Sequence, residues 1–190
     1  MIRLAAVIVL LVLGSCASTL NPPRNITNAC SMKAERPQWF RALSRSEAKW
    51  GVPVHVQLAT IWRESRFVGD ARTPRKYVLG FIPAGRISSA YGYSQALNGT
   101  WDWYRKDTGR RGADRDDFDD ATDFIGWYMN QTLARNGIPL DDAYRQYLAY
   151  HEGHTGYERG SYNRKGFLLR AANEVRSMAA TYDAQLMTCS

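Results

Sequence analysis

One glutamate stands where its carboxyl group could exchange protons with a bound molecule. Glu64 lies in segment 61–67, IWRESRF, with apolar residues on both sides. A carboxylic acid acts as general acid and base when its pKa is raised towards the working pH, and apolar surroundings raise it because they disfavour the charged form. Taken alone, a helical glutamate before a serine is more typical of a solvated helix face. A catalytic role for Glu64 therefore needs support from other motifs in the chain.

Two short motifs follow Glu64-Ser65 along the chain. Segment 92–95 reads GYSQ, a Gly-x-x-Gln motif, and segment 149–153 reads AYHEG, an Ala-Tyr-x-x-Gly motif. In this order and with these gaps, they resemble the active-site motifs of lytic transglycosylases of the soluble-lytic (SLT) type, whose catalytic domain is similar to lysozyme. Each motif alone is weak, but the ordered set is fairly specific, and the resemblance covers about residues 45–165.

The resemblance implies a role for each matching residue. Glu64 would be the general acid and base, and Ser65 would contact substrate beside it. Gln95 would line the saccharide cleft, and the Tyr150 hydroxyl would help to hold Glu64. His151 stands where the family has an asparagine that touches sugar. The implied enzyme cleaves the MurNAc-GlcNAc β-1,4 bond of peptidoglycan to 1,6-anhydro-MurNAc ends, without a cofactor.

The resemblance also implies that one carboxylate is enough to cleave the glycosidic bond. Ordinary glycosidases use a second carboxylate as nucleophile or base, whereas lytic transglycosylases let the muramic acid 6-hydroxyl group attack the anomeric carbon. Between Glu64 and Gly92 the only acidic residue is Asp70, and the next is Asp102. Goose-type lysozymes place aspartates in this stretch to position water, so the sequence favours the lyase reaction. A hydrolytic muramidase and a non-catalytic peptidoglycan-binding lipoprotein remain as alternatives.

Three nearby patterns could indicate other chemistry. His151 and His154 are three residues apart, whereas the helical zinc motif needs histidines four apart, so we expect no metal site. Segment 92–96, GYSQA, is close to the Gly-x-Ser-x-Gly nucleophile elbow, but a poor core strand precedes it and the chain lacks βα alternation. Trp101 and Trp103 could stack on sugars, although core packing is the more common use of such residues.

The elements that must position these residues are mostly helices. Helical spacing and capping residues predict helices over about residues 37–49, 53–65, 100–106, 119–136, 139–152 and 164–187. Glu64 then lies near the C-terminal end of the second helix, and Asp119 or Asp120 caps the fourth. Residues 77–79 and 81–82 predict a short hairpin, and 154–163 a loop. We expect a mainly α (α+β) fold, a lysozyme-like helical domain with a small β-hairpin.

Residues 1–15 predict a lipoprotein signal peptide. Arg3 supplies positive charge, residues 4–13 form an apolar run too short to span a bilayer, and small residues precede Cys16. This pattern resembles the bacterial lipoprotein signal, in which cleavage leaves a lipidated cysteine at the new N-terminus. The residues after Cys16 are Ala17 and Ser18, and the lack of an aspartate favours the periplasmic side of the outer membrane over the inner membrane. An ordinary secretory signal is the alternative.

The other two cysteines stand near the ends of the mature chain. Cys30 and Cys189 can pair in an oxidising compartment, and we expect a disulfide, with two unpaired thiols as the alternative. We expect residues 16–35 to form the lipidated cysteine and a short polar tether, and residues 36–190 to form one domain.

The charge balance is compatible with a cell-wall polymer. The formal net charge is +7, or +6 once Arg3 leaves with the signal peptide. Basic residues are scattered among acidic ones, and the secretory signal argues against nucleic acid as a partner. We expect a monomer that binds peptidoglycan glycan strands and meets the membrane only through its lipid.

Overall fold

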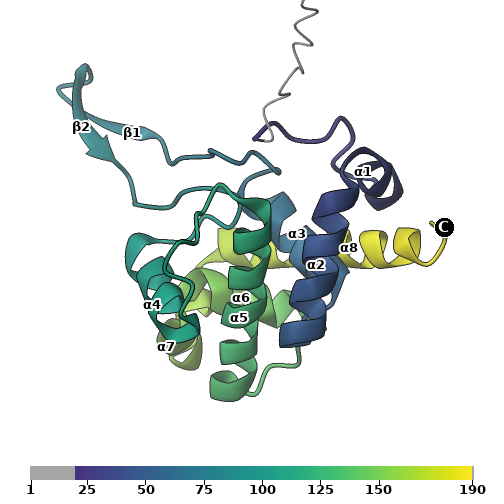
Figure 1. Ribbon diagram of the computed structural model, residues 1–190. Coiled ribbons are helices and arrows are strands. Elements are labelled where there is room, and N and C mark those ends of the chain that lie inside the picture. The colour runs from purple at the N-terminus through teal and green to yellow at the C-terminus, as the bar shows by residue number, and fades with distance from the viewer. Residues whose placement is uncertain (1–19, 190) are drawn as a thin grey trace, which may run out of the picture.

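The computed structural model describes residues 20–189, and this part of the chain is mostly helical (Figure 1). The α-helices are α1 Ala29–Glu35, α2 Pro37–Trp50, α3 Val54–Glu64, α4 Asn98–Thr108, α5 Phe118–Asn136, α6 Ala143–Glu152, α7 His154–Glu158 and α8 Gly166–Leu186. The strands are β1 Arg75–Val78 and β2 Ile82–Arg86, and Ser161–Arg164 forms a 3-10 helix, η1. The mainly α fold and its small hairpin are confirmed.

Helix α3, which ends at Glu64, is the central helix of the domain. Every residue from Val56 to Trp62 is buried, and a helix that is covered all round needs partners on every side. Helix α8 packs along it most extensively, and α2, α5 and α6 contact it as well. The side chain of Gln57 donates a hydrogen bond to the Val52 carbonyl oxygen at 2.8 Å, so this buried amide nitrogen is satisfied. Glu64 is therefore carried by a rigid element.

Helices α2 and α5 pack closely because α5 has a glycine at the contact. A Cβ atom at Gly126 would lie 2.4 Å from Oγ of Ser46, so no larger residue fits without a shift. The Ser46 hydroxyl donates to the Thr122 carbonyl oxygen at 2.8 Å across the same interface. Beyond it, the rings of Trp39 and Phe118 stack with centroids 4.0 Å apart. Together these contacts fix α5 behind the site described below.

The hairpin projects away from the helices (Figure 1). Strands β1 and β2 pair antiparallel, with Tyr77 opposite Pro83 and Val78 opposite Ile82, and a register irregularity lies between Arg75 and Tyr77. All strand residues are exposed. The expected hairpin is present, but its strands begin two residues earlier and end four residues later than expected, and Leu79 and Phe81 belong to the turn.

The described chain N-terminal of residue 36 packs against the domain. The amide of Gly69 donates to the Leu20 carbonyl oxygen at 2.7 Å, and Met32 of α1 is fully buried. A Cys30–Cys189 disulfide, with Cα atoms 5.5 Å apart, joins α1 to the end of the chain after α8. The expected disulfide is present, and the folded unit includes residues before 36. Cys16 and the expected signal peptide lie outside the described residues.

Two local expectations were wrong. The α5 helix is capped by Asp117, whose side chain accepts from the Asp120 amide, rather than by Asp119 or Asp120. Residues 154–163 are not a loop, because α7 and η1 occupy most of them. Gly153, at φ +74°, ends α6, and the chain then resumes helical turns. Among the described residues, no helix has the length and apolar character required to cross a membrane.

Candidate active site

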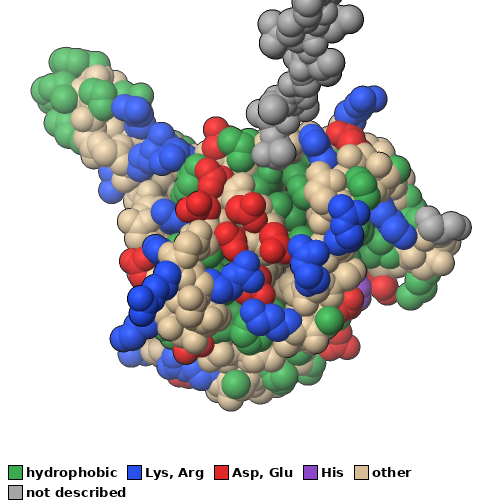
Figure 2. Space-filling model, in the orientation of Figure 1, with side chains coloured by type: hydrophobic (Ala, Val, Ile, Leu, Met, Phe, Trp, Pro, Cys, Tyr) green, Lys and Arg blue, Asp and Glu red, His purple; other side chains and the backbone are tan. Residues whose placement is uncertain are grey.

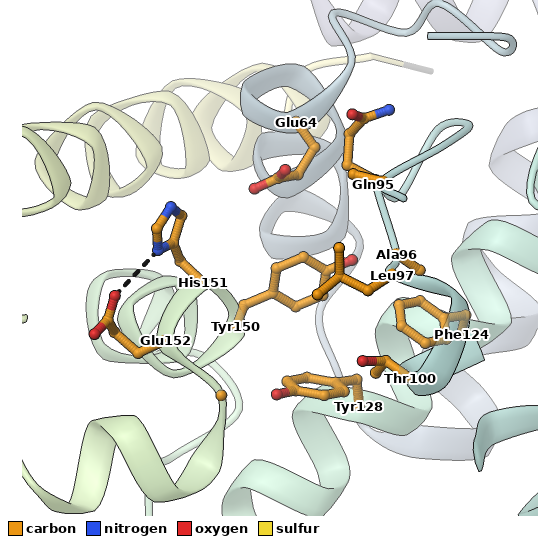
Figure 3. Close-up of a pocket in the computed structure, with 12 residues that line it drawn as sticks. Glu64, Gln95, Ala96, Leu97, Thr100, Phe124, Tyr128, Tyr150, His151 and Glu152 are labelled. Carbon is orange, nitrogen blue, oxygen red and sulfur yellow. Dashed lines mark hydrogen bonds and ion pairs between the residues drawn. The ribbon is translucent and has the colours of Figure 1, made fainter. Parts of the chain in front are cut away.

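A cavity of about 340 Å³ opens at the C-terminal end of α3. Its walls come from α3, from the segment before α4, and from α4, α5 and α6 (Figure 3). The lining residues are Glu64, Ala90, Gln95, Ala96, Leu97, Thr100, Phe124, Tyr128, Tyr150, His151, Glu152 and Gly153. The fold thus brings together four expected site residues, Glu64, Gln95, Tyr150 and His151, from three segments that are far apart in the sequence.

The Glu64 carboxyl group lies in this cavity and is otherwise surrounded by protein. Burial raises the pKa of Glu64 from its ordinary 4.5 to about 7. A hydrogen bond with Tyr147 and the positive charge of Arg63 act in the opposite direction but are outweighed. Near neutral pH both the acid and the carboxylate are populated, which suits a group that must both give and take a proton.

Tyr147 is a site residue that the sequence reasoning placed only on a helix. Its side chain is buried, and its hydroxyl interacts with Glu64. Burial together with the charge of Glu64 raises the pKa of Tyr147 well above its ordinary range, so the hydroxyl keeps its proton as a donor. Tyr147 stands one helical turn before Tyr150 and shares its side of α6, and this spacing was the available signal.

Tyr150 lines the cavity, but its hydroxyl has a different partner from the one expected. It donates to the backbone carbonyl oxygen of Ser94 at 2.6 Å, tying α6 to the Gly-x-x-Gln segment. The rings of Tyr150 and Tyr128 meet edge to face with centroids 5.3 Å apart. Burial first, and then the charge of Glu64, raises the pKa of Tyr150 well above its ordinary range. The Tyr150 ring therefore forms a neutral wall beneath Glu64 (Figure 3).

Gln95 lies in a tight turn whose backbone is constrained. Its φ is +50°, uncommon for a residue with a side chain, and Gly92 has φ +79°. A Cβ atom at Gly92 would lie 2.0 Å from the Arg115 carbonyl oxygen, so this position requires glycine. The Gln95 side-chain nitrogen donates to the carbonyl oxygens of Ala71 at 2.9 Å and Gly92 at 2.8 Å. Its amide oxygen stays on the side nearer Glu64 (Figure 3).

A second carboxylate, Glu152, lines the same cavity. Its side chain is only 3% exposed, and Nζ of Lys165 lies 2.7 and 2.9 Å from its two oxygens. Burial alone would raise its pKa, but hydrogen bonds from Lys165 and Ser161 outweigh burial and lower it. Nδ1 of His151 lies 3.2 Å from the same carboxylate. Glu152 is thus a charged group held by partners, which sets it apart from Glu64.

Ser65 and Asp70 do not line the cavity. The Ser65 side chain is buried, and its hydroxyl donates back to the Ile61 carbonyl oxygen at 3.3 Å. Asp70 is exposed in the segment that follows α3. The structure therefore gives Ser65 a place in the helix end rather than in the cavity wall.

The other chemistries considered from the sequence have no support in the described residues. Ser94 is fully buried, which does not suit a nucleophile, and no group of three or more potential metal ligands occurs in the described part of the chain. His154 is buried, with Nε2 3.0 Å from the Thr132 hydroxyl. Trp101 is buried against Tyr104 and Phe124, as expected for core packing, whereas Trp103 is partly exposed.

Comparison with protein families gives a match that runs almost the full length of the chain. Residues 4–189 match the family described as Transglycosylase SLT domain. The chain belongs to this family. Membership confirms the resemblance drawn from the three motifs, and it supports a transglycosylase that acts on peptidoglycan glycan strands in general terms. A search of curated proteins found no match to the chain.

Proposed function

We propose that this SLT-family protein is a lytic transglycosylase that cleaves the MurNAc-GlcNAc β-1,4 bond and leaves 1,6-anhydro-MurNAc ends. The observation that carries the proposal is the Glu64 carboxyl group, which lies in the cavity with its pKa raised to about 7. Glycan binding alone does not need a partly protonated acid, so this feature favours an enzyme over a non-catalytic binding lipoprotein.

The reaction needs two proton transfers at Glu64. Protonated Glu64 donates its proton to the bridging oxygen as the bond from that oxygen to the anomeric carbon breaks. The resulting carboxylate then takes the proton of the muramic acid 6-hydroxyl group, while the oxygen of that hydroxyl group forms a bond to the anomeric carbon. No water is consumed, and Glu64 ends in its starting form. In the family the N-acetyl group of the substrate stabilises the intermediate, so no protein nucleophile is required.

The remaining cavity residues are proposed as substrate contacts. Gln95 offers its amide oxygen, and Tyr150 offers the face of its ring. His151, which replaces the usual asparagine, also lines the cavity and brings an imidazole ring to the saccharide. No cofactor or metal is part of this proposal.

A hydrolytic muramidase is the second candidate, and Glu152 is the observation that favours it. Its carboxylate lines the cavity and stays charged, as a group that positions water must. The carboxylate is, however, already engaged by Lys165 and Ser161. We therefore rank hydrolysis below the lyase reaction.

We further propose that the protein is a lipoprotein. Cleavage after residue 15 would leave Cys16 lipidated and anchor the protein to the periplasmic face of the outer membrane. Metabolic labelling with a radioactive fatty acid, compared between the wild type and Cys16→Ala, tests this directly. Label should enter the wild type alone.

The catalytic proposal is tested by Glu64→Gln, with Glu158→Gln as an exposed control on α7. Removing a general acid and base costs typically about 10²–10⁴-fold in rate, so Glu64→Gln should release no detectable soluble fragments from purified peptidoglycan. It should still sediment with the insoluble polymer, because the cavity keeps its shape. Lytic activity at the wild-type level in Glu64→Gln would reject the assignment.

A further inference from the structure

The hairpin arm, residues 75–86, touches no helix of the described chain. Strands β1 and β2 have extensive contacts only with each other, and every strand residue is exposed. An isolated two-stranded hairpin is only marginally stable in water. Packing within the described part of the domain therefore does not explain why the arm is present.

The tip of the arm is apolar. Leu79 and Phe81 are 78% and 73% exposed, and Tyr77, Val78 and Ile82 beside them are also exposed. Figure 2 shows these side chains as a continuous apolar cap at the end of the arm. A contiguous apolar patch exposed on a folded domain marks a contact with another molecule.

The base of the arm is basic. Arg72, Arg75, Lys76 and Arg86 lie there, and no acidic residue occurs between Asp70 and Asp102. None of these four forms an ion pair within the described residues; the Arg86 guanidinium instead donates to the Thr73 carbonyl oxygen at 2.6 Å. An apolar tip above a basic base is complementary to an anionic lipid surface, where headgroup phosphates lie above acyl chains.

The beginning of the described chain lies on the same side of the molecule. Leu20 is hydrogen-bonded to Gly69, close to where the arm leaves the domain (Figure 1). Cys16 precedes Leu20 by four residues, which span at most about 14 Å when extended. A strand rises about 3.3 Å per residue, so the tip of the arm stands roughly 15 Å beyond its base. A lipid at Cys16 and the arm can therefore reach one membrane together.

We propose that the hairpin arm docks on an anionic phospholipid surface, with its tip at the boundary of headgroups and acyl chains and its basic base at the phosphates. Together with the lipid it would hold the domain at two points, so the cavity would keep a fixed orientation relative to the membrane. The proposal goes beyond glycan cleavage and relies on lipidation only for the second point of attachment. It departs from the expectation, drawn from the sequence, that only the lipid meets the membrane.

The test uses the chain from residue 17 onward, which has no lipid and retains every described residue, including the disulfide. Its binding is measured by flotation with vesicles of phosphatidylcholine alone or with one quarter phosphatidylglycerol. We expect binding to the anionic vesicles that weakens with salt. Leu79→Asp combined with Phe81→Asp should lower this binding at least tenfold, and aspartate tolerates the left-handed φ of +53° at residue 79.

The matched control is Leu133→Asp combined with Met187→Asp, which adds the same two charges at exposed apolar positions on α5 and after α8. It should bind like the wild type. Absence of wild-type binding, or equal binding by the arm variant, would overturn the proposal. Loss of binding to insoluble peptidoglycan by the arm variant, without vesicle binding by the wild type, would assign the arm to glycan instead. Glu64→Gln should bind vesicles normally, which separates this proposal from the catalytic one.

Discussion

At the scale of single residues, Glu64 links activity to a cost in stability. Its pKa is raised to about 7 in the folded protein, whereas the unfolded chain has the ordinary value of 4.5. The folded state then holds the proton more tightly, so Glu64 favours folding fully below pH 4.5 and loses that contribution as pH rises to about 7. Above this pH the wild type contains a charged carboxylate in an unfavourable environment.

Glu64→Gln should therefore stabilise the fold at pH 8. The neutral amide avoids the cost of the charged form, and the gain should be about 1–3 kcal/mol in the free energy of unfolding. Denaturant unfolding at pH 8 and pH 4 measures it, and the difference between the proteins should shrink at pH 4. A variant less stable than the wild type at pH 8 would contradict the raised pKa.

Tyr147 should tune the pH dependence of catalysis. Its hydrogen bond lowers the pKa of Glu64, so Tyr147→Phe should raise that pKa further. Because the first step needs protonated Glu64, kcat/KM falls as pH rises above about 7, and this alkaline limb should move to higher pH in the variant. Tyr144→Phe, a partly buried tyrosine on the same helix, should leave the limb in place. A limb that stays or moves to lower pH in Tyr147→Phe would remove Tyr147 from the site.

At the scale of elements, the turn that carries Gln95 depends on one glycine. At Gly92 a Cβ atom would meet the Arg115 carbonyl oxygen, and the φ of +79° adds strain for any other residue. Gly92→Ala should lower the free energy of unfolding by about 2–4 kcal/mol and weaken glycan binding, because Gln95 is displaced. Thermal unfolding measures the first effect and sedimentation with peptidoglycan the second.

The control for that change is Gly99→Ala, in the first turn of α4, where a Cβ atom would meet no atom within 4 Å. It should change stability by less than about 1 kcal/mol. Equal destabilisation by both substitutions would show that the close approach of Arg115 is unimportant.

The sequence predicted the elements better than the contacts between them. Helical spacing, together with the prolines and glycines that flank them, located the helices that carry Glu64 and Tyr150. It could not show that Tyr147 reaches Glu64, which depends on how α6 packs against α3, or that the Tyr150 hydroxyl meets Ser94, which depends on how α6 packs against the segment before α4. The sequence also predicted a loop over residues 154–163, because this segment is rich in glycine and tyrosine. The two short helices found there depend on tertiary contacts, which the spacing of residues in the sequence does not reveal.

At the scale of the whole molecule, the Cys30–Cys189 disulfide closes nearly the entire domain into one loop, with a sequence separation of 159 residues. Replacing both cysteines with serine should lower the free energy of unfolding by about 2–5 kcal/mol, because the unfolded chain regains freedom. Denaturant unfolding of the chain from residue 17 measures this. Alkylation without reductant should leave its mass unchanged, and two alkyl adducts would show that the bond does not form in solution.

The central question for the whole molecule is whether Glu64 acts without a second catalytic carboxylate. The most direct measurement is mass spectrometry of the products released from purified peptidoglycan by the chain from residue 17. A lytic transglycosylase with one acid and base predicts 1,6-anhydro-muramyl ends, which are one water lighter than hydrolysis products. Reducing muramic acid ends would contradict the account and make Glu152 the first residue to replace.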